Sequence, residues 1–253
     1  MELWYTDKHT EDVNFSIKVK RQLASHKSEI QQIDILDTYG FGRVLVLDGD
    51  LMITEKDEYI YHEMMTHVPM AVHPHVESDK EVVTLSSIHL PFTACKLRDP
   101  RVRMHFEEGL RFVRGKNDAY DLIIVDCPDP YGPAEGLFTR EFYGNCCNAL
   151  KDDGILINQH ESPFYAAHQT SVKNAHAHIS YEFSVSTVYQ CHIPSYPSGH
   201  WLFGFASLKY DPVRDLDAAR WESLGISTRY YNTELHRGAF ALPNYVRELL
   251  NQK

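Results

Sequence analysis

Residues 120–138 read YDLIIVDCPDPYGPAEGLF. The four consecutive apolar residues Leu122–Val125 are typical of a strand that is covered on both faces. Asp126 follows this strand directly, and three prolines and a glycine restrict the loop that places Asp129 three residues further on. This part of the chain therefore predicts a buried strand that ends in a stiff, acidic loop.

Two further β-rich runs, Val102–Phe106 and Ile155–Ile157, alternate with segments of helical pattern around this strand. Such alternation predicts an α/β fold, a doubly wound and mostly parallel sheet with helices on both faces. Ligands of these sheets bind at the carboxyl ends of the strands. The candidate site residues are therefore those that follow each run, at Glu107–Gly109, Asp126–Asp129 and Asn158–Glu161.

The first 54 residues have a different pattern, in which short apolar runs alternate with polar residues and end at glycine-containing turns. Phe15, Ile17 and Val19 share one parity, as expected for one face of a strand. We predict a small antiparallel β domain over residues 1–54 and the doubly wound domain over residues 55–253.

A helix is expected at the junction of these two parts. Thr54–Asp57 has the form of a helix start, and apolar residues recur from Ile60 at three- and four-residue spacing. Because proline lacks the N–H that a helix interior needs, we expect this helix of about three turns to end at Pro69.

The overall composition is that of an ordinary globular protein, with 43% hydrophobic and 24% charged residues among 253. The formal net charge of −10 argues against a nucleic-acid partner and is compatible with a cationic one. No apolar run reaches the ~18 residues of a membrane span, and the N-terminus lacks the apolar segment of a signal peptide. The five cysteines are odd in number and show no C-x-x-C spacing, so we expect a cytoplasmic protein.

The paired acidic residues of the loop suggest a chemistry. Two carboxylates held in one stiff loop can bind an alkylammonium group and then take up its proton. The alternative is that Asp126 and Asp129 only form or cap turns. A metal site is not expected, because His62 and His67 are five residues apart and no H-E-x-x-H motif is present. A nucleophilic Cys127 is disfavoured too, since the neighbouring aspartates oppose a thiolate.

Residues 126–138 resemble the signature D-[ST]-[ST]-D-P-x-G-P-x-x-x-L-F of the spermidine synthase family. Further similar motifs occur in the same order at Leu3–Tyr5, Val46–Gly49, Thr54–Met64, Ile193–Gly199 and Tyr230–Asn232. The resemblance implies a Rossmann-like fold of the S-adenosylmethionine-dependent transferase type, with an N-terminal β domain, in a homodimer or homotetramer. It also implies transfer of the aminopropyl group of decarboxylated S-adenosylmethionine, a co-substrate, to a diamine such as putrescine without a cofactor.

The same resemblance assigns roles to individual residues. Asp126 would accept the proton of the attacking amine, and Tyr61 and Tyr196 would flank the amine and the aminopropyl chain. The implied substrate-binding residues are Asp129, Gln31, His62, Gln159, Glu108 and Pro133. Cys127 and Pro128 replace the usual Ser/Thr pair, and Glu108 replaces an aspartate, so specificity could shift while the reaction type should not.

One family feature is missing, the Gly-rich loop after the first strand together with the acidic end of the second strand. Residues 73–78 correspond to the segment before that first strand, whereas residues 79–83 already resemble the helix after the second. A strand–loop–helix–strand unit takes ~30 residues. We expect this unit to be missing between Ser78 and Asp79 from this sequence and not from the natural protein, and an ordinary Cα separation of ~3.8 Å there would contradict this.

Three alternatives stay open at this point. The first is a methyltransferase on the same fold, which would use S-adenosylmethionine itself. The second is a non-catalytic polyamine-binding homologue, in case the Gly-rich unit is truly deleted. The third is an aminopropyltransferase that prefers cadaverine, agmatine or spermidine as acceptor, because the sequence does not give the length of the pocket.

Overall fold

The computed structural model describes residues 2–28, 31–74, 100–127 and 136–251. They form two compact units. The N-terminal unit holds the residues up to Tyr59, residues 100–104 and Ile193–Gly199. The second unit holds the rest, beginning at Ile60. The predicted boundary between residues 54 and 55 stays a prediction.

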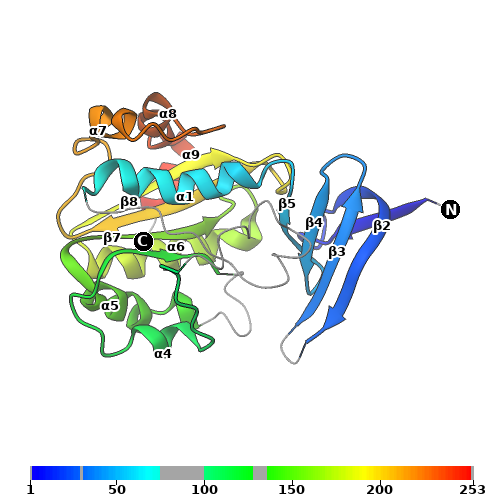
Figure 1. Ribbon diagram of the computed structural model, residues 1–253, viewed down its shortest axis with the longest axis horizontal. Coiled ribbons are helices and arrows are strands. Elements are labelled where there is room, and N and C mark those ends of the chain that lie inside the picture. Colours follow the sequence, from blue (N-terminus) through cyan, green and yellow to red (C-terminus); the bar gives the residue numbers. More distant parts are fainter. Residues whose placement is uncertain (1, 29–30, 75–99, 128–135, 252–253) are drawn as a thin grey trace. The chain divides into compact units, whose positions relative to one another are not determined.

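The N-terminal unit contains the expected antiparallel sheet, with five strands in the order β1-β2-β3-β4-β5 (Figure 1). The strands are β1 (Leu3–Asp7), β2 (Phe15–Lys27), β3 (Gln32–Thr38), β4 (Arg43–Leu47) and β5 (Asp50–Thr54). Alternate residues such as Ile17, Val19, Val44 and Val46 bury one face. The period-two pattern of the sequence is therefore confirmed.

Two turns of this sheet need residues that tolerate positive φ. Gly42 has a φ of 69°, and a Cβ there would lie 2.7 Å from the Glu55 carboxylate. Between β4 and β5, Asp48 and Gly49 have φ values of 51° and 102°. Glycine adopts this region without the steric cost that other residues meet, which explains the turn signals in the sequence.

Asp57 ties a distant loop to the N-terminal unit. Its carboxylate accepts the Ser195 N–H at 2.8 Å and the Ser195 hydroxyl at 3.0 Å. It also accepts the Thr54 hydroxyl at 2.6 Å. The segment Ile193–Gly199, which joins two strands of the other unit, is thus held by side chains of this one.

The second unit is built on a four-stranded sheet in the order β6-β7-β9-β8. The strands are β6 (Tyr120–Val125), β7 (Leu150–Glu161), β8 (Val185–His192) and β9 (His200–Ser207). β6 and β7 are parallel, whereas β9 is antiparallel to both β7 and β8. Among the described strands the sheet is therefore mixed, which corrects the expectation of a mostly parallel one.

Helices cover both faces of this sheet, as expected for the predicted fold class (Figure 1). The helices are α1 (Glu58–Val72), α4 (Gly109–Val113), α5 (Arg140–Ala149), α6 (Ala166–Glu182), α7 (Ala218–Ser223), α8 (Thr233–Ala239) and α9 (Asn244–Asn251). On one face, the Tyr189 hydroxyl of β8 donates to the Met64 carbonyl of α1 at 2.9 Å. On the other face, Leu156 and Ala206 pack in one core cluster with Ile179 of α6.

Two local predictions are wrong. Helix α1 does not end at Pro69 but continues to Val72, because the apolar residues of its last turn are buried and the His73 N–H bonds the Pro69 carbonyl at 2.8 Å. Val102–Phe106 forms no strand, and Phe106 is 80% exposed. A β-rich run becomes a strand only where a neighbouring strand supplies its hydrogen bonds, and these residues have none among the described strands.

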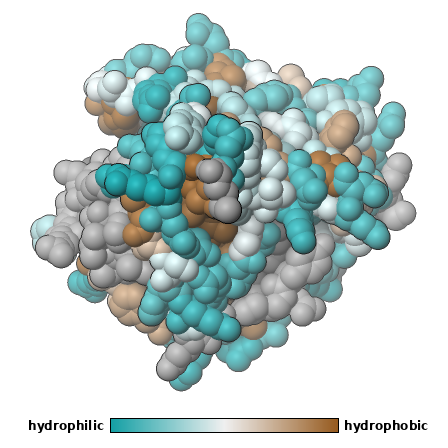
Figure 2. Space-filling model, turned by 90° about the vertical axis from the view of Figure 1, so that its right-hand side faces the viewer, coloured by the Kyte–Doolittle hydropathy of each residue, from teal (hydrophilic) through white to brown (hydrophobic). Residues whose placement is uncertain are grey.

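The face drawn in Figure 2 is mostly hydrophilic, with small apolar patches between polar residues. In the N-terminal unit, Leu3 and Trp4 of β1 are each 52% exposed. Within the described ranges, no helix is both long enough and apolar enough to cross a membrane.

Candidate active site

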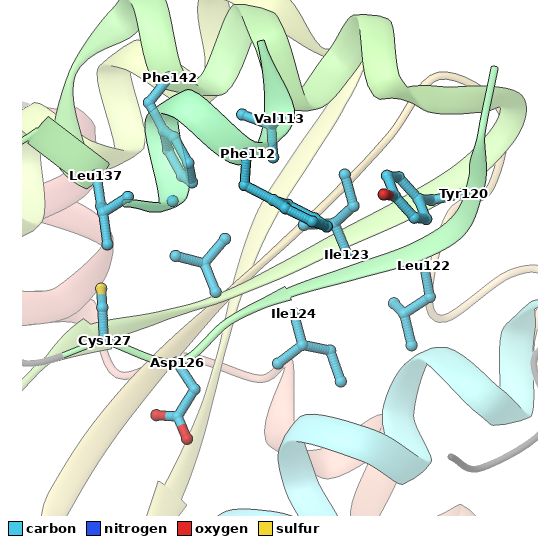
Figure 3. A pocket seen from close by; sticks show the side chains of 12 residues that line it. Phe112, Val113, Tyr120, Leu122, Ile123, Ile124, Asp126, Cys127, Leu137 and Phe142 are labelled. Atoms are coloured by element: carbon cyan, nitrogen blue, oxygen red, sulfur yellow. The ribbon is translucent and has the colours of Figure 1, made fainter. Parts of the chain in front are cut away.

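β6 places Asp126 where the sequence analysis expected it, directly after the strand. Val125 is buried, whereas Asp126 is exposed. Figure 3 shows the Asp126 carboxylate turned to the side of β6 on which α1 runs, away from Phe112, Val113 and Phe142. The strand end therefore presents a carboxylate to the α1 face of the sheet.

Tyr61 of α1 meets this carboxylate. Its hydroxyl donates to Asp126 Oδ1 at 2.7 Å. The ring is 9% exposed and packs edge-on against Phe203 of β9, with ring centroids 5.1 Å apart. Because the ring is fixed by packing, the phenol holds the carboxylate in one orientation. The structure thus brings together two of the three residues that the family resemblance placed at the chemistry.

Gln159 holds the residue next to Asp126. Its side-chain Nε2 donates to the Cys127 carbonyl at 3.3 Å, and its Oε1 accepts the Glu161 N–H at 3.0 Å. Gln159 itself is 3% exposed. Both ends of this amide are therefore engaged in fixing the ends of β6 and β7.

A cavity of about 340 Å³ lies beside β6 (Figure 3). Its wall includes Asp126, Cys127, Gly109 and Leu137. A Cβ on Gly109 would lie only 2.8 Å from Leu137 Cδ2, so glycine is required for this close approach. The mostly apolar walls suit a flat apolar part of a ligand, whereas the Asp126 carboxylate is turned to the α1 side of β6.

Glu108 stands at the start of α4, next to this cavity. Its two carboxylate oxygens accept the N–H groups of Leu110 and Arg111, each at 2.9 Å. This is the geometry of a helix N-cap, in which a carboxylate satisfies the free donors of the first turn. The substrate contact predicted for Glu108 stays a prediction.

Other predicted residues lie in different places. His62 neighbours Tyr61 on α1, with ring centroids 5.9 Å apart. Tyr196 and Gln31 belong to the N-terminal unit, where the Tyr196 hydroxyl donates to the Met52 carbonyl at 2.8 Å and the Gln31 N–H donates to the Ser28 hydroxyl at 2.9 Å. Asp129 and Pro133 lie outside the described residues, as do Ser78 and Asp79.

The two cysteines of α5 have raised pKa values. Burial raises the pKa of Cys146 to about 12, and the adjacent Cys147 adds to this effect. The pKa of Cys147 is raised by burial and by Glu182. In the part of the chain that the structure describes, no group of three or more His, Cys, Asp or Glu side chains is arranged to hold a metal ion.

Sequence reasoning missed Phe203, which supports the Tyr61 ring, and the Cys127 carbonyl, which Gln159 holds. Phe203 is one apolar residue in a run of buried ones, so nothing in its local pattern distinguishes it. The sequence predicted that the ends of these two strands lie at the same edge of the sheet, but the individual contact from Gln159 to the Cys127 carbonyl depends on the register of β6 with β7.

Similar proteins were found in three comparisons. Residues 3–55 match the spermidine synthase tetramerisation domain, and residues 75–216 match the spermine/spermidine synthase domain. A polyamine aminopropyltransferase of Lachnoclostridium phytofermentans is 65% identical over 99% of both chains. One of Alkaliphilus oremlandii is 55% identical over 100% of this chain and 99% of the relative.

Crystal structures give the same result. A spermidine synthase in complex with the transition-state analogue AdoDATO superposes with a TM-score of 0.92 at 37% identity, over 98% of this chain and 94% of that one. The spermidine synthase of Thermotoga maritima gives a TM-score of 0.91 at the same identity and coverage.

The alignment with the Lachnoclostridium relative is longer than this chain. It runs over 279 positions, whereas the chain has 253 residues, so at least 26 positions face no residue here. This length is close to the ~30 residues of a strand–loop–helix–strand unit. Agreement over both domains at this level of identity leaves no doubt about descent, and the chain belongs to the spermine/spermidine synthase family.

Proposed function

We propose that this protein transfers the aminopropyl group of decarboxylated S-adenosylmethionine to putrescine, which gives spermidine and methylthioadenosine. The observation that carries the proposal is the 2.7 Å hydrogen bond from Tyr61 to Asp126, at the edge of the cavity beside β6. The reaction class is supported by the relatives, which are named polyamine aminopropyltransferases.

In this mechanism Asp126 is the general base. A carboxylate has about four lone-pair positions, so the bond from Tyr61 leaves capacity to accept an N–H of the amine. Asp126 takes one proton from the attacking nitrogen, and the freed lone pair attacks the methylene carbon that is bound to the sulfonium. The carbon–sulfur bond breaks, its electron pair stays on sulfur, and methylthioadenosine leaves as a neutral thioether.

The protein contributes mainly position and proton removal. Tyr61 orients the carboxylate, and Gln159 fixes the backbone of the next residue. We propose that no metal or other cofactor takes part, because the positively charged sulfur already activates the leaving group.

Replacing Asp126 tests the proposed base. Asp126→Asn keeps the shape and an acceptor for Tyr61 but removes the basic oxygen, so turnover should fall by at least ~100-fold. Release of methylthioadenosine from decarboxylated S-adenosylmethionine and putrescine is the measurement. Turnover within a few-fold of the wild type would remove Asp126 from this role.

The acceptor is the finer part of the proposal. Putrescine is favoured by the similarity to enzymes named spermidine synthases. A competition assay with diamines of graded length, together with agmatine and spermidine, identifies the preferred acceptor. The same assay with S-adenosylmethionine in place of the decarboxylated donor tests the methyltransferase alternative, which predicts methyl transfer.

Binding of the donor, decarboxylated S-adenosylmethionine, involves the segment of the Lachnoclostridium relative that has no equivalent in this chain. We propose that the cavity wall of Gly109 and Leu137 holds part of the nucleoside and that the missing unit supplies the rest. Two proteins should be compared, the 253-residue chain and a variant with the unmatched segment of the Lachnoclostridium relative inserted after Ser78. Transfer by the longer protein alone would support this division, whereas transfer by neither would refute the proposed function.

We also propose a homodimer or homotetramer in the cytoplasm. The match of residues 3–55 to a tetramerisation domain supports assembly, and Cys127, Cys146, Cys147 and Cys191 form no disulfide among the described residues. Light scattering of the purified protein measures the assembly directly, and a monomer at micromolar concentration would contradict it.

A further inference from the structure

The end of β7 departs from its regular antiparallel pairing with β9 one residue beyond Gln159. Gln159 pairs with Phe203 of β9, but Glu161 pairs with the next residue, Leu202. His160 is therefore an extra residue, a β-bulge. Glu161 has a φ of 71°, which is strained for a side chain of its size. Bulges next to active sites commonly re-aim side chains.

The bulge is connected to the candidate base through Gln159. The Glu161 N–H, the strained end of the bulge, donates to the Gln159 side chain, which in turn donates to the Cys127 carbonyl. Cys127 is the residue after Asp126. A shift at the bulge therefore moves the hydrogen bond that holds the backbone next to Asp126.

The opposite face of β7 supports the bulge. Asn158 Nδ2 and His160 Nδ1 are hydrogen-bonded at 2.9 Å. The His160 ring also meets His176 of α6 edge-on, with ring centroids 6.0 Å apart. His160 is 3% exposed and Asn158 is 1% exposed. This side-chain pair is packed between the sheet and α6, away from the Tyr61 side.

Gly204 of β9 makes room for the pair. It lies opposite Asn158, and a Cβ there would come within 2.2 Å of Asn158 Oδ1 and 2.6 Å of His160 Cε1. Any side chain at position 204 would therefore clash with both buried groups. The absence of a side chain at position 204 thus leaves room for the His160 ring.

His160 is suited to a fixed structural task and not to proton transfer. Burial, with a smaller effect of His176, lowers its pKa to about 3. The ring is therefore neutral throughout the neutral pH range. Its Nε2 has no hydrogen-bond partner among the described residues, so a charge on the ring would be uncompensated.

We propose that His160, seated over Gly204, is a positioning residue that holds the bulge at the end of β7 and, through Gln159, the backbone of Cys127 next to Asp126. The inference rests on the proposed function for its effect on turnover. Its structural part, the coupling of His160 to the backbone of Cys127, is independent of that function and is measured without substrate.

The test uses the Cys127 thiol as a reporter. In a Cys95→Ser, Cys147→Ser background the remaining cysteines besides Cys127 are Cys146 and Cys191, which are 0% and 1% exposed. His160→Ala should raise the rate at which a thiol reagent labels Cys127 by about fivefold, the factor that corresponds to one net hydrogen bond of ~1 kcal/mol. In a Gln159→Met background, the same substitution should cause no further increase.

Gly204→Ala reaches the same pair by a different route and should raise the labelling rate while His160 is intact. Gly238→Ala in α8 is the matched control, because nothing lies within 4 Å of a Cβ there and its labelling should equal that of the parent. Circular dichroism checks that each variant is folded. If His160→Ala does not fold, the labelling rate of Gly204→Ala decides the test.

The two possible failures are distinguishable. Unchanged labelling in the folded His160→Ala and Gly204→Ala variants overturns the inference, whatever the activity. If neither the 253-residue chain nor the variant with the inserted segment transfers an aminopropyl group but labelling rises as expected, the proposed function fails and the positioning role stands. In an active protein, His160→Ala should lower kcat/KM by a similar factor of about five at every pH from 6 to 9, because the ring does not titrate there.

Discussion

The two sheets of the molecule differ in how far apart in the sequence their stabilising partners lie. In the N-terminal sheet each strand pairs with the strand that follows it. In the second sheet β7 pairs with β9, and side chains join residues far apart, such as Tyr61 with Asp126 across 65 positions and Tyr189 with Met64 across 125. The strand pairing of the first sheet is therefore local, although Asp57 and Tyr196 also link distant residues of its unit, whereas the second sheet pairs distant strands and holds the candidate chemistry.

The largest loss of stability is expected where one side chain makes several long-range hydrogen bonds. The Glu63 carboxylate on α1 accepts the backbone N–H groups of Arg229, Tyr230 and Tyr231, each at 2.8 Å. Glu63→Ala removes the acceptor of all three donors and should lower the free energy of unfolding by at least ~3 kcal/mol. Denaturant titration is the measurement. Glu248→Ala, an exposed position of α9, is the control and should change little.

The next effect concerns activity. Tyr61→Phe keeps the ring packed against Phe203 but removes the bond to Asp126, so kcat/KM should fall by about tenfold to a hundredfold, as for a hydrogen bond to a charged group. Tyr189→Phe is the matched control, since it loses a buried hydroxyl bond that does not touch Asp126. Equal losses of kcat/KM in both variants would mean that the Tyr61 effect is only structural.

A smaller effect is expected in the N-terminal sheet. Gly42→Ala forces a Cβ into the left-handed region and against Glu55, which should destabilise this unit by ~1–2 kcal/mol. Trp4 is its tryptophan, so a Trp201→Phe, Trp221→Phe background reports on this unit alone. Gly40→Ala, with no atom within 4 Å, is the control. In a separate Trp4→Phe background, an equal shift of the Trp201 and Trp221 signals would show that the two units unfold together and would contradict a separate effect on this unit.

A further effect is a pH dependence of the second unit. His236 is buried, with Nδ1 bonded to the Tyr231 hydroxyl at 2.7 Å and Nε2 to the Pro212 carbonyl at 2.9 Å. Burial lowers its pKa to about 4 from the usual value of 6.5. Between these values the unfolded chain binds a proton that the folded one does not, so stability is complete above pH 6.5 and falls as the pH decreases to about 4.

His236→Gln should therefore reduce the slope of unfolding free energy against pH by up to ~1.4 kcal/mol per pH unit in this window. Urea titrations at pH 7.5, 6 and 5 measure the slope. His178→Gln, in which a partly buried ring contacts the Phe138 carbonyl, serves as the comparison. Parallel pH profiles of the His236 variant and the parent would contradict the neutral, buried state.

The same contrast explains what the sequence could and could not predict. Strands and turns of the N-terminal sheet follow from period two and from glycine, which act locally. The Pro69 error arose because burial of the last turn of α1 outweighs one missing hydrogen bond, and the Val102–Phe106 error because strand formation needs a neighbour. The meeting of Tyr61 with Asp126 came from the family resemblance, since no spacing reveals it. The fit of His160 over Gly204 depends on pairing across two strands and had no signal at all.

The hydrogen bonds from Ser195 to Asp57 limit how the protein can be truncated. Because the N-terminal unit includes Ile193–Gly199, it is discontinuous in the chain, and a truncation after Tyr59 would remove two of the donors that Asp57 accepts. Such a fragment would expose a carboxylate whose hydrogen bonds are made by a segment more than a hundred residues away. The five-stranded sheet is therefore not an autonomous module, and its isolation requires a circular permutant or a co-expressed loop peptide.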